Sequence, residues 1–405
     1  MSKNTIISGL DIGSSTIKLL VATTKKKEKN LEVITLVEEP SFGVRKGVVI
    51  SPEKVSEIIR ILLEKVKTET GQKINSVYVN IGGSHLFSTS SRGLVSVSRA
   101  DGKVSEEDVE RVLQAARTFS MSSNKEILEI FPKEFILDGQ SGIKEVVGLQ
   151  GVRLETDVLV VGGFSPFKNN LTQAVLDADV HQILDIVPSV LASSVAVLLP
   201  RQKELGVALL DIGGGTTNLA VFEEDNLIHL AVLPMGSSNI TNDIAIGLKI
   251  DVDTAEMIKI KLGSCILKSS WKKEKMEIEG EEPLIFSQKT LVRIIEARVL
   301  EIFEEVKKEL KKISKAGLLP AGVVLTGGGA KLPHIVELAK KELKLPCRIG
   351  KPSKFNNLED DPSFAAACGL VLRGIELQEG KIWRREGSLP GLKDKIKNFF
   401  KIFIP

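Results

Sequence analysis

The stretch "LLDIGGGTTNLAVF", residues 209–222, places three consecutive glycines between two apolar, strand-like runs. Glycine weakens the interior of a strand, so such a run marks a tight turn or the close approach of another group to the backbone. A related pattern occurs 200 positions earlier, where "LDIGSSTIKLLV" (10–21) overlays "LDIGGGTTNLAV" (210–221) with seven identities in twelve positions. Both copies predict a strand, a tight turn and a second strand. We therefore expect two related halves that each open with the same hairpin.

Both turns have the composition of a phosphate-binding loop. Glycine lets several backbone N–H groups converge on an anion without a Cβ in the way, and the neighbouring hydroxyls add donors. A pair of hairpins without a ligand is the alternative, and the repetition argues against it. The predicted phosphate-binding residues are Gly13, Ser14, Ser15, Thr16, Lys18, Gly213, Gly214, Gly215, Thr216, Thr217 and Asn218.

An aspartate ends the apolar strand before each turn. Asp11 and Asp211 could face each other across a cleft and hold a hydrated Mg²⁺, an ion that prefers hard oxygen ligands and retains waters. A third glycine cluster, "GVVLTGGGAKLPHI" (322–335), follows a strand and precedes a helical segment. Its spacing matches neither a dinucleotide-binding fold nor a P-loop. Alone it could be a close strand–helix crossing, but with the two hairpins it indicates a site for the nucleoside, at Gly327, Gly328 and Gly329.

The regions between these motifs alternate strands and helices. Residues 51–69 have a Ser-Pro start and helical apolar spacing, and residues 290–313 predict a long surface helix with one apolar stripe. Residues 84–162 differ, because short strands surround a single helix that Ser105 can cap. This stretch predicts a small α+β insertion in the first half.

Composition and charge exclude several classes of protein. No apolar run approaches the length of a membrane span, and no signal peptide is evident. The three cysteines share no ligand spacing and are expected to be buried thiols in a reducing cytoplasm. The net charge is +3, but residues 381–405 alone carry +5. This asymmetry argues against general nucleic-acid binding and for a specialised basic tail.

The tail itself, "GLKDKIKNFFKIFIP" (391–405), has the pattern of an amphipathic helix. Its apolar residues recur on one helical face and its lysines on the other, which suits a membrane interface. Docking of this helix on its own domain is the alternative, and the Gly- and Pro-containing segment 377–391 before it favours a flexible linker. The predicted membrane-binding residues are Leu392, Ile396, Lys397, Phe399, Phe400 and Phe403.

Two hairpins followed by a Gly-rich segment resemble the superfamily of actin, hexokinase and DnaK-type ATPases. Within it the chain is most similar to the FtsA family of bacterial cell-division proteins. "SSRGLVSVSRADGKVSEEDVERVLQAA" and "EVVGLQGVRLETDVLVV" resemble the inserted subdomain of that family, and "AVLPMGSSNITNDIAIGLKIDVDTAEMIKIKLGSC" resembles its segment after the second hairpin. The likeness covers nearly the whole chain.

The resemblance implies an α/β actin-like fold, a duplicated ribonuclease H-like architecture with two lobes around a nucleotide cleft. It also implies that Glu256 and Lys259 lie near the nucleoside, although solvent-facing helix charges are the commoner explanation for such residues. The implied domains are lobe 1 in two parts (1–83 and 163–203), the inserted subdomain (84–162), lobe 2 (204–361), a connecting helix returning to lobe 1 (362–376), a linker (377–391) and the membrane-targeting helix (392–405).

The resemblance further implies function. Such a protein binds ATP and Mg²⁺, polymerises into actin-like filaments on anionic lipid at the inner face of the cytoplasmic membrane, and tethers the tubulin-like protein FtsZ and other division proteins at the division site. Relatives often place acids where this chain has Ser189 and Asn218. Because two potential catalytic carboxylates are missing, we predict slow or undetectable ATP hydrolysis.

Three other classes share parts of the pattern. A PilM-type adaptor of type IV pilus assembly, which binds the cytoplasmic peptide of an inner-membrane protein, would not need the amphipathic tail. A sugar or acetate kinase would need an acidic base between the lobes, and none is identified. A DnaK-type chaperone would need a substrate-binding domain, but only about 30 residues follow the last connecting helix.

Overall fold

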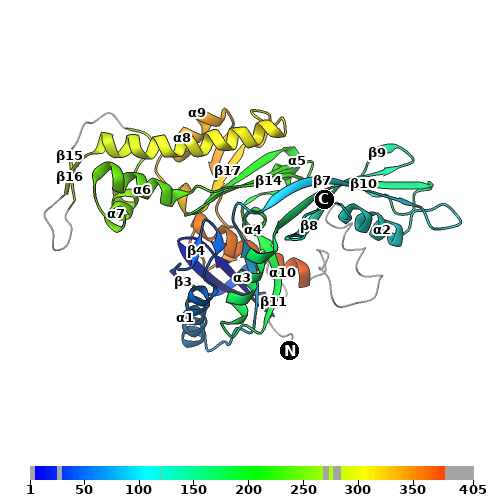
Figure 1. Cartoon of the computed structure of the whole chain (residues 1–405), viewed down its shortest axis with the longest axis horizontal. Helices are drawn as coiled ribbons and strands as arrows, with labels where there is room; N and C mark the ends of the chain where they lie inside the picture. The colour runs from blue at the N-terminus through cyan, green and yellow to red at the C-terminus, as the bar shows by residue number, and fades with distance from the viewer. Residues whose placement is uncertain (1–4, 25–29, 120, 268–272, 277–283, 379–405) are drawn as a thin grey trace.

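The computed structural model describes residues 5–24, 30–119, 121–267, 273–276 and 284–378. Its two lobes lie one above the other, and a subdomain extends to one side (Figure 1). Within this part of the chain, no helix is both long and apolar enough to span a bilayer. The predicted membrane-binding helix lies outside the described residues, with Leu392, Ile396, Lys397, Phe399, Phe400 and Phe403.

Five strands of each lobe's sheet follow the same order. Lobe 1 has the order β3-β2-β1-β6-β11, with β19 added beside β3, and lobe 2 has the corresponding order β14-β13-β12-β17-β18. The first three strands of each lobe form an antiparallel meander, and the next two pair in parallel beside the first. The lobe 1 strands are β1 (Thr5–Ile12), β2 (Thr16–Thr24), β3 (Leu31–Pro40), β6 (Ser76–Ile81), β11 (Gln182–Pro188) and β19 (Phe355–Asn356). The lobe 2 strands are β12 (Val207–Ile212), β13 (Thr217–Glu223), β14 (Asn226–Leu233), β17 (Val323–Thr326) and β18 (Cys347–Ile349).

The two predicted hairpins have the same register. Asp11 pairs with Lys18 in lobe 1, and Asp211 pairs with Asn218 in lobe 2, so the sequence offset of 200 residues is kept in the pairing. The interior positions of both hairpins are buried, since each sheet is covered on both faces. The predicted duplicated, two-lobed actin-like fold is confirmed.

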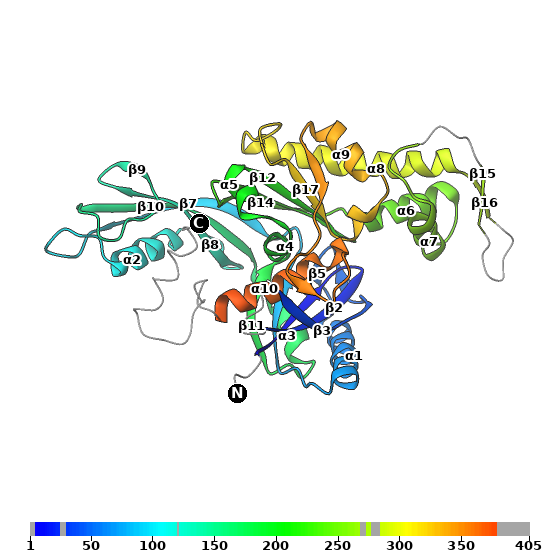
Figure 2. The same cartoon turned by 180° about the vertical axis from the view of Figure 1, so that it is seen from behind.

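Two helices with small side chains cross where the lobes join. They are α4 (Ser189–Val197) and α10 (Ala365–Gln378), which lie next to each other in the centre of the molecule (Figure 2). A Cβ atom added to Gly369 would overlap with the carbonyl oxygen of Ala192, so only glycine allows this approach. The remaining lobe 1 helices, α1 (Pro52–Thr70) and α3 (Ser165–Leu176), pack against each other, and the short α5 (Pro200–Leu205) precedes β12.

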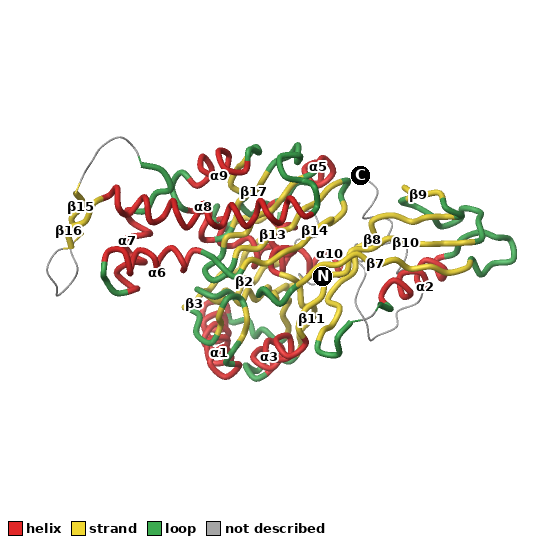
Figure 3. The backbone as a smooth tube through the Cα atoms, turned by 45° about the horizontal axis from the view of Figure 1, so that its top comes forward, coloured by secondary structure: helices red, strands yellow, loops and turns green. Residues whose placement is uncertain are grey.

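The inserted subdomain is a second, smaller sheet with one helix. Its strand order is β7-β10-β8-β9, and Figure 3 shows it extending away from both lobes. The helix α2 begins at the predicted cap, because the Ser105 side chain accepts from the Asp108 N–H and the Asp108 carboxylate accepts from the Ser105 N–H. Its elements are β7 (Phe87–Ser96), α2 (Glu106–Arg117), β8 (Lys125–Leu137), β9 (Gln140–Ile143) and β10 (Arg153–Phe164).

Helices cover the lobe 2 sheet. The long α8 (Gln288–Lys312) buries a stripe that includes Leu291, Ile295 and Val306 and leaves its charged face exposed, as the sequence predicts. Helices α6 and α7 project at the end of lobe 2 opposite to the insert (Figure 1). The other elements of this lobe are α6 (Ser237–Leu248), α7 (Val252–Leu262), β15 (Lys273–Met276), β16 (Leu284–Ser287), the 3₁₀ turns η1 (Gly328–Lys331) and η2 (Pro362–Phe364), and α9 (Ile335–Leu343).

Candidate nucleotide site

The two predicted phosphate turns have the same local geometry. The Gly13 N–H donates to the Thr16 carbonyl at 3.1 Å, and the Gly213 N–H donates to the Thr216 carbonyl at 2.9 Å. These bonds close each hairpin around a two-residue loop. The N–H groups at the loop tips are therefore free of the strand ladder and available to an anion.

The turns of the two lobes are in direct contact. A Cβ atom added to Gly214 would overlap with Ser15 Oγ, and one added to Gly215 would lie 2.7 Å from Ser14 Oγ. Real Cβ atoms do not approach another atom this closely, so a side chain at either position would have to displace the serine side chains of the first turn. The absence of a side chain at Gly214 and Gly215 therefore lets the second turn lie in contact with the first.

Two buried aspartates lie directly behind the turns. Asp11 accepts from Asn80 Nδ2 at 2.6 Å, and Asp211 accepts from Ser193 Oγ at 2.7 Å. Burial raises the pKa of the Asp11 carboxyl, and burial together with repulsion from Asp11 raises the pKa of Asp211 to about 6. The Lys18 ammonium opposes both shifts. The pair is thus an electronegative site that a cation would stabilise.

The donor set of this aspartate pair fits Mg²⁺. Both groups are hard oxygen ligands, and within the described part of the chain the neutral donors Asn80 and Ser193, rather than an ion pair, hold Asp11 and Asp211 in place. Across the described residues no group of three or more His, Cys, Asp or Glu side chains could hold a metal ion. Mg²⁺ does not need such a cage, because it commonly uses one or two carboxylates together with waters and phosphates.

Burial divides the predicted phosphate ligands into two groups. The turn residues Gly13, Ser14, Ser15 and Gly213–Gly215 are partly or fully accessible. Thr16 is also partly accessible, whereas Lys18, Thr216, Thr217 and Asn218 are buried. Among the described residues, Thr217 Oγ1 has no hydrogen-bond partner. Lys18 Nζ donates to Thr16 Oγ1 at 2.5 Å, so its charge lies beneath the first turn.

The third glycine cluster packs on the end of β12. Gly327 has φ +83, and Cβ atoms added to Gly327 and Gly329 would overlap with Asp211 and Ile212. Among the described residues, apart from Gly328 itself and its chain neighbours, no atom lies within 4 Å of the position that a Cβ on Gly328 would take. The Gly327 N–H donates to the Pro362 carbonyl at 3.1 Å. The backbone at Gly328 is therefore the open face of this cluster, on the lobe 2 side of the aspartates.

Glu256 and Lys259 lie on α7 against the start of α6. Lys259 is 6% exposed, and its ammonium donates to Glu256, to Thr241 Oγ1 at 2.8 Å and to the Ser237 carbonyl at 3.3 Å. The Ser237 N–H in turn donates to the Gly213 carbonyl at 2.8 Å. Lys259 is thus not a solvent-facing helix charge, and it is linked to the second turn through a single residue of α6.

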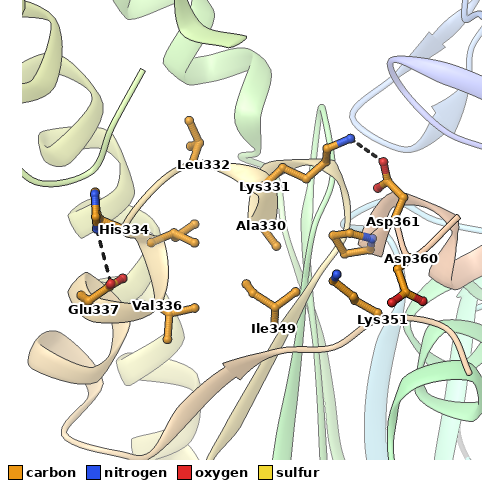
Figure 4. Close-up of a pocket in the computed structure, with 12 residues that line it drawn as sticks. Ala330, Lys331, Leu332, His334, Val336, Glu337, Ile349, Lys351, Asp360 and Asp361 are labelled. Carbon is orange, nitrogen blue, oxygen red and sulfur yellow. Dashed lines mark hydrogen bonds and ion pairs between the residues drawn. The ribbon is translucent and has the colours of Figure 1, made fainter. Parts of the chain in front are cut away.

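A cavity of about 390 Å³ lies beside the glycine cluster (Figure 4). Ala330 and Lys331 form one side of it, and Asp360, Asp361 and Pro362 form another. Lys331 and Asp361 form an ion pair at its rim. Neither Glu256 nor Lys259 lines this cavity, so the structure does not bring all the predicted nucleoside residues around one hollow.

Sequence reasoning missed the residues that support the aspartates. Asn80 is buried at the end of β6, where it accepts from the Ile12 N–H at 2.7 Å and donates to Asp11 and to Ser189 Oγ. A polar residue that ends the apolar strand "SVYVNIGG" was a usable signal for Asn80. Ser193 lies in a helix rich in Ala and Ser, and nothing in that pattern distinguishes it.

Two lobes of matching topology, joined by crossing helices and facing each other through paired hairpin turns, define the actin-like class. Comparison with known proteins identifies the branch of this class. The family model described as "Cell division protein FtsA" matches residues 208–369, and the "SHS2 domain inserted in FTSA" matches residues 83–162. The chain belongs to the FtsA family of cell-division proteins.

The sequence similarity to curated relatives extends over almost the whole length of the chain. The chain is 35% identical to the cell division protein FtsA of Pseudomonas aeruginosa over 92% of this chain and 90% of that protein. It is 36% identical to the FtsA of Borreliella burgdorferi over 99% and 98% of the two chains, and 30% identical to that of Escherichia coli K12 over 92% and 90%.

Solved structures agree on the fold. A chain of the PilM–PilN type IV pilus biogenesis complex is similar with a TM-score of 0.67 and 19% identity, covering 91% of this chain and 98% of that one. MreB5 of Spiroplasma citri, in a structure bound to ADP, is similar with a TM-score of 0.56 and 14% identity, covering 92% and 96%. At these identities the likeness concerns the fold alone.

Proposed function

We propose that this chain is an ATP-binding, actin-like cell-division protein that polymerises on the inner face of the cytoplasmic membrane. In this proposal its C-terminal amphipathic helix anchors it to anionic lipid, and it tethers the FtsZ ring at the division site together with other division proteins. The observation that carries the nucleotide part is the contact of two matched turns over the buried pair Asp11 and Asp211. Two loops whose N–H groups lie outside the strand ladder, next to two carboxylates that a cation would stabilise, suit a Mg²⁺-bound polyphosphate.

Nucleotide binding would change the orientation of the lobes. The two turns touch through Gly214 and Ser15, so a phosphate chain between them requires the turns to separate. The lobes are joined by the close crossing of α4 and α10 at Gly369, which is the natural pivot for that separation. A ligand that binds only the separated arrangement shifts the population towards it. ATP and ADP would then favour different lobe angles.

The same site is poorly equipped for hydrolysis. Ser189 begins α4, and its hydroxyl donates to the Ile81 carbonyl at 3.2 Å. Asn218 occupies the position opposite Asp211. Neither side chain can serve as a general base for an attacking water. We therefore propose slow or undetectable turnover, so that ATP acts as an assembly signal.

Assembly would make a weak membrane anchor effective. Each basic residue near an anionic leaflet contributes on the order of 1 kcal/mol, and burial of the tail's apolar face adds a few kcal/mol. Once one tail of a filament is inserted, the others bind at a high effective concentration. Filament formation would therefore couple the nucleotide site to membrane binding and to the capture of FtsZ.

Electron microscopy on lipid monolayers tests this proposal. Full-length protein and a variant lacking residues 392–405 are compared with ATP, ADP and no nucleotide. We expect filaments on anionic lipid only with ATP and the tail. Filaments that form equally in all nucleotide conditions would contradict the nucleotide part, and filaments of the truncated variant on lipid would contradict the membrane part.

The second candidate is a PilM-type adaptor, which the fold likeness to a PilM–PilN chain favours. Such an adaptor would bind a membrane protein's peptide and not lipid. Vesicles of pure lipid distinguish the two functions. Retention of the full-length protein on such vesicles supports the division protein, and its absence together with binding to a pilus-protein peptide supports the adaptor.

A further inference from the structure

A small hairpin that the sequence reasoning did not consider reaches the two turns. It consists of β4 (Val44–Arg45) and β5 (Val48–Val49), joined by the two-residue turn Lys46–Gly47. Both turn residues are left-handed, with φ 48 for Lys46 and φ 75 for Gly47. This is the geometry of a type I′ turn, which favours Asn-Gly or Gly-Gly.

The tip of this hairpin lies against the phosphate turns of both lobes. The Gly47 N–H donates to Ser14 Oγ at 2.8 Å, which attaches the tip to the first turn. A Cβ atom added to Gly215 would lie 3.1 Å from Lys46 Cα, so the second turn packs against the same tip. Lys46 is therefore positioned at the point where the two turns meet.

The hairpin is held rigidly from behind. A Cβ atom added to Gly47 would lie 2.7 Å from the Gly83 backbone nitrogen, so the tip packs on the loop that follows β6. Val49 is 3% exposed, and its carbonyl accepts from Asn170 Nδ2 at 3.1 Å. A rigid base means that the position of the Lys46 backbone is set by lobe 1 rather than by solvent.

The left-handed backbone of Lys46 is strained, and no polar contact of its side chain within the described residues offsets this strain. A residue with a Cβ in the left-handed region costs roughly 1 kcal/mol, and Asn or Gly would cost less. Within the described residues, the exposed Lys46 ammonium has no hydrogen bond and no ion pair. A strained residue without structural partners at a proposed binding site points to a role of its side chain in binding.

The geometry points to Lys46 as the residue that binds the terminal phosphate of a nucleoside triphosphate. This inference rests on the proposed nucleotide function. The glycine cluster at Gly328 reaches the aspartates from lobe 2, whereas Lys46 reaches the turns from lobe 1. A nucleotide whose nucleoside lies at Gly328 would place the far end of its phosphate chain towards Lys46. A lysine ammonium there binds that phosphate as a point charge, so ATP would bind more tightly than ADP.

Replacing Lys46 with asparagine removes the side-chain charge and keeps the left-handed backbone conformation of the turn. Asparagine is well suited to the left-handed turn, so Lys46→Asn should fold with unchanged or slightly higher thermal stability. We expect its affinity for Mg-ATP to fall at least about tenfold, the loss typical of one charge-assisted bond. Affinity for Mg-ADP should change by less than about twofold. Isothermal titration calorimetry on the full-length protein measures both.

Two further variants sharpen this test. Lys46→Arg keeps the charge and should retain the preference for ATP over ADP. Arg45→Ala removes the adjacent exposed cation, and both affinities should stay as in the unmodified protein. An unchanged ATP-to-ADP ratio in Lys46→Asn, or an equal loss in Arg45→Ala, would overturn the assignment. If the unmodified protein binds neither nucleotide, the proposed function fails instead, so the two failures are distinguishable.

Discussion

Replacing Asp211 with asparagine should stabilise the ligand-free protein at neutral pH while it removes the response to Mg²⁺. Burial and the nearby Asp11 carboxylate raise the pKa of Asp211 from 3.8 to about 6. The folded protein therefore binds this proton more tightly than the unfolded chain does. The contribution of the group to stability is present below pH 3.8 and is lost as the pH rises to about 6. Asparagine carries no such cost, and its amide oxygen can still accept from Ser193 Oγ.

The magnitude follows from the pKa. A rise from 3.8 to about 6 corresponds to about 3 kcal/mol of free energy between the two protonation states. The difference in the free energy of unfolding between Asp211→Asn and the unmodified protein should therefore grow by about 3 kcal/mol between pH 3.5 and pH 7.5. Urea denaturation across this pH range, without nucleotide or metal, measures it.

A second aspartate provides the control for this experiment. Asp243 pairs with Arg298 at 2.6 Å on the surface of lobe 2. Asp243→Asn is the same chemical change, but it breaks an ion pair and should reduce stability at neutral pH by roughly 1 kcal/mol. A stability difference for Asp211→Asn that does not vary with pH, or that has the sign expected for Asp243→Asn, would refute the reasoning about the buried pair.

Three other perturbations test separate parts of the structure. Gly369→Ala places a Cβ against the Ala192 carbonyl at the helix crossing and should lower the free energy of unfolding by at least about 2 kcal/mol, measured by denaturant titration. Burial lowers the pKa of His85, whose Nδ1 accepts from the Phe164 N–H. The free energy of unfolding should therefore fall as the pH drops below 6.5, and His85→Gln should weaken this pH dependence in thermal unfolding scans. Deletion of residues 392–405 should abolish co-sedimentation with anionic liposomes, and full retention would exclude the tail as the anchor.

The hairpins could be predicted because their information is local. Each needs an apolar strand, a Gly- and Ser-rich turn and a second strand within about 14 consecutive residues, and the internal repeat supplies an independent check. The α2 cap at Ser105 and the apolar stripe of α8 are local in the same sense. Elements of this kind follow from periodicity and capping without knowledge of what they pack against.

The supports of the aspartates could not be predicted in the same way. Asn80 is 69 residues from Asp11 along the chain, and Ser193 donates to Asp211 from a helix that crosses between the lobes. Their roles arise only when β6 pairs beside β1 and α4 packs over β12. Lys259 illustrates the same limit, because its burial depends on α7 folding back onto α6, whereas a lysine on a predicted helix is more commonly a solvent-facing charge.

The β4–β5 hairpin has a local turn pattern in the sequence, but this pattern is weaker than the glycine motifs. "GVRKGVV" places a two-residue turn with glycine between short valine-containing strands. The strands are only two residues long, and such a hairpin is not stable alone. Its stability comes from the contacts of Gly47 with Ser14 and with the loop after β6. Tertiary contacts therefore decide whether this pattern becomes a hairpin.

The charges behind the turns make metal and nucleotide binding interdependent. Asp11, Asp211 and Lys18 together carry a formal charge of −1 when both carboxylates are ionised, and this charge repels a polyphosphate. One Mg²⁺ would change it to +1 and would also offset the repulsion from Asp11 that, together with burial, raises the pKa of Asp211. We therefore expect ATP affinity to fall at least about tenfold when EDTA removes the metal, and Asp211→Asn to show little further loss in EDTA. Equal ATP affinity with and without Mg²⁺ would show that the aspartate pair does not serve the metal.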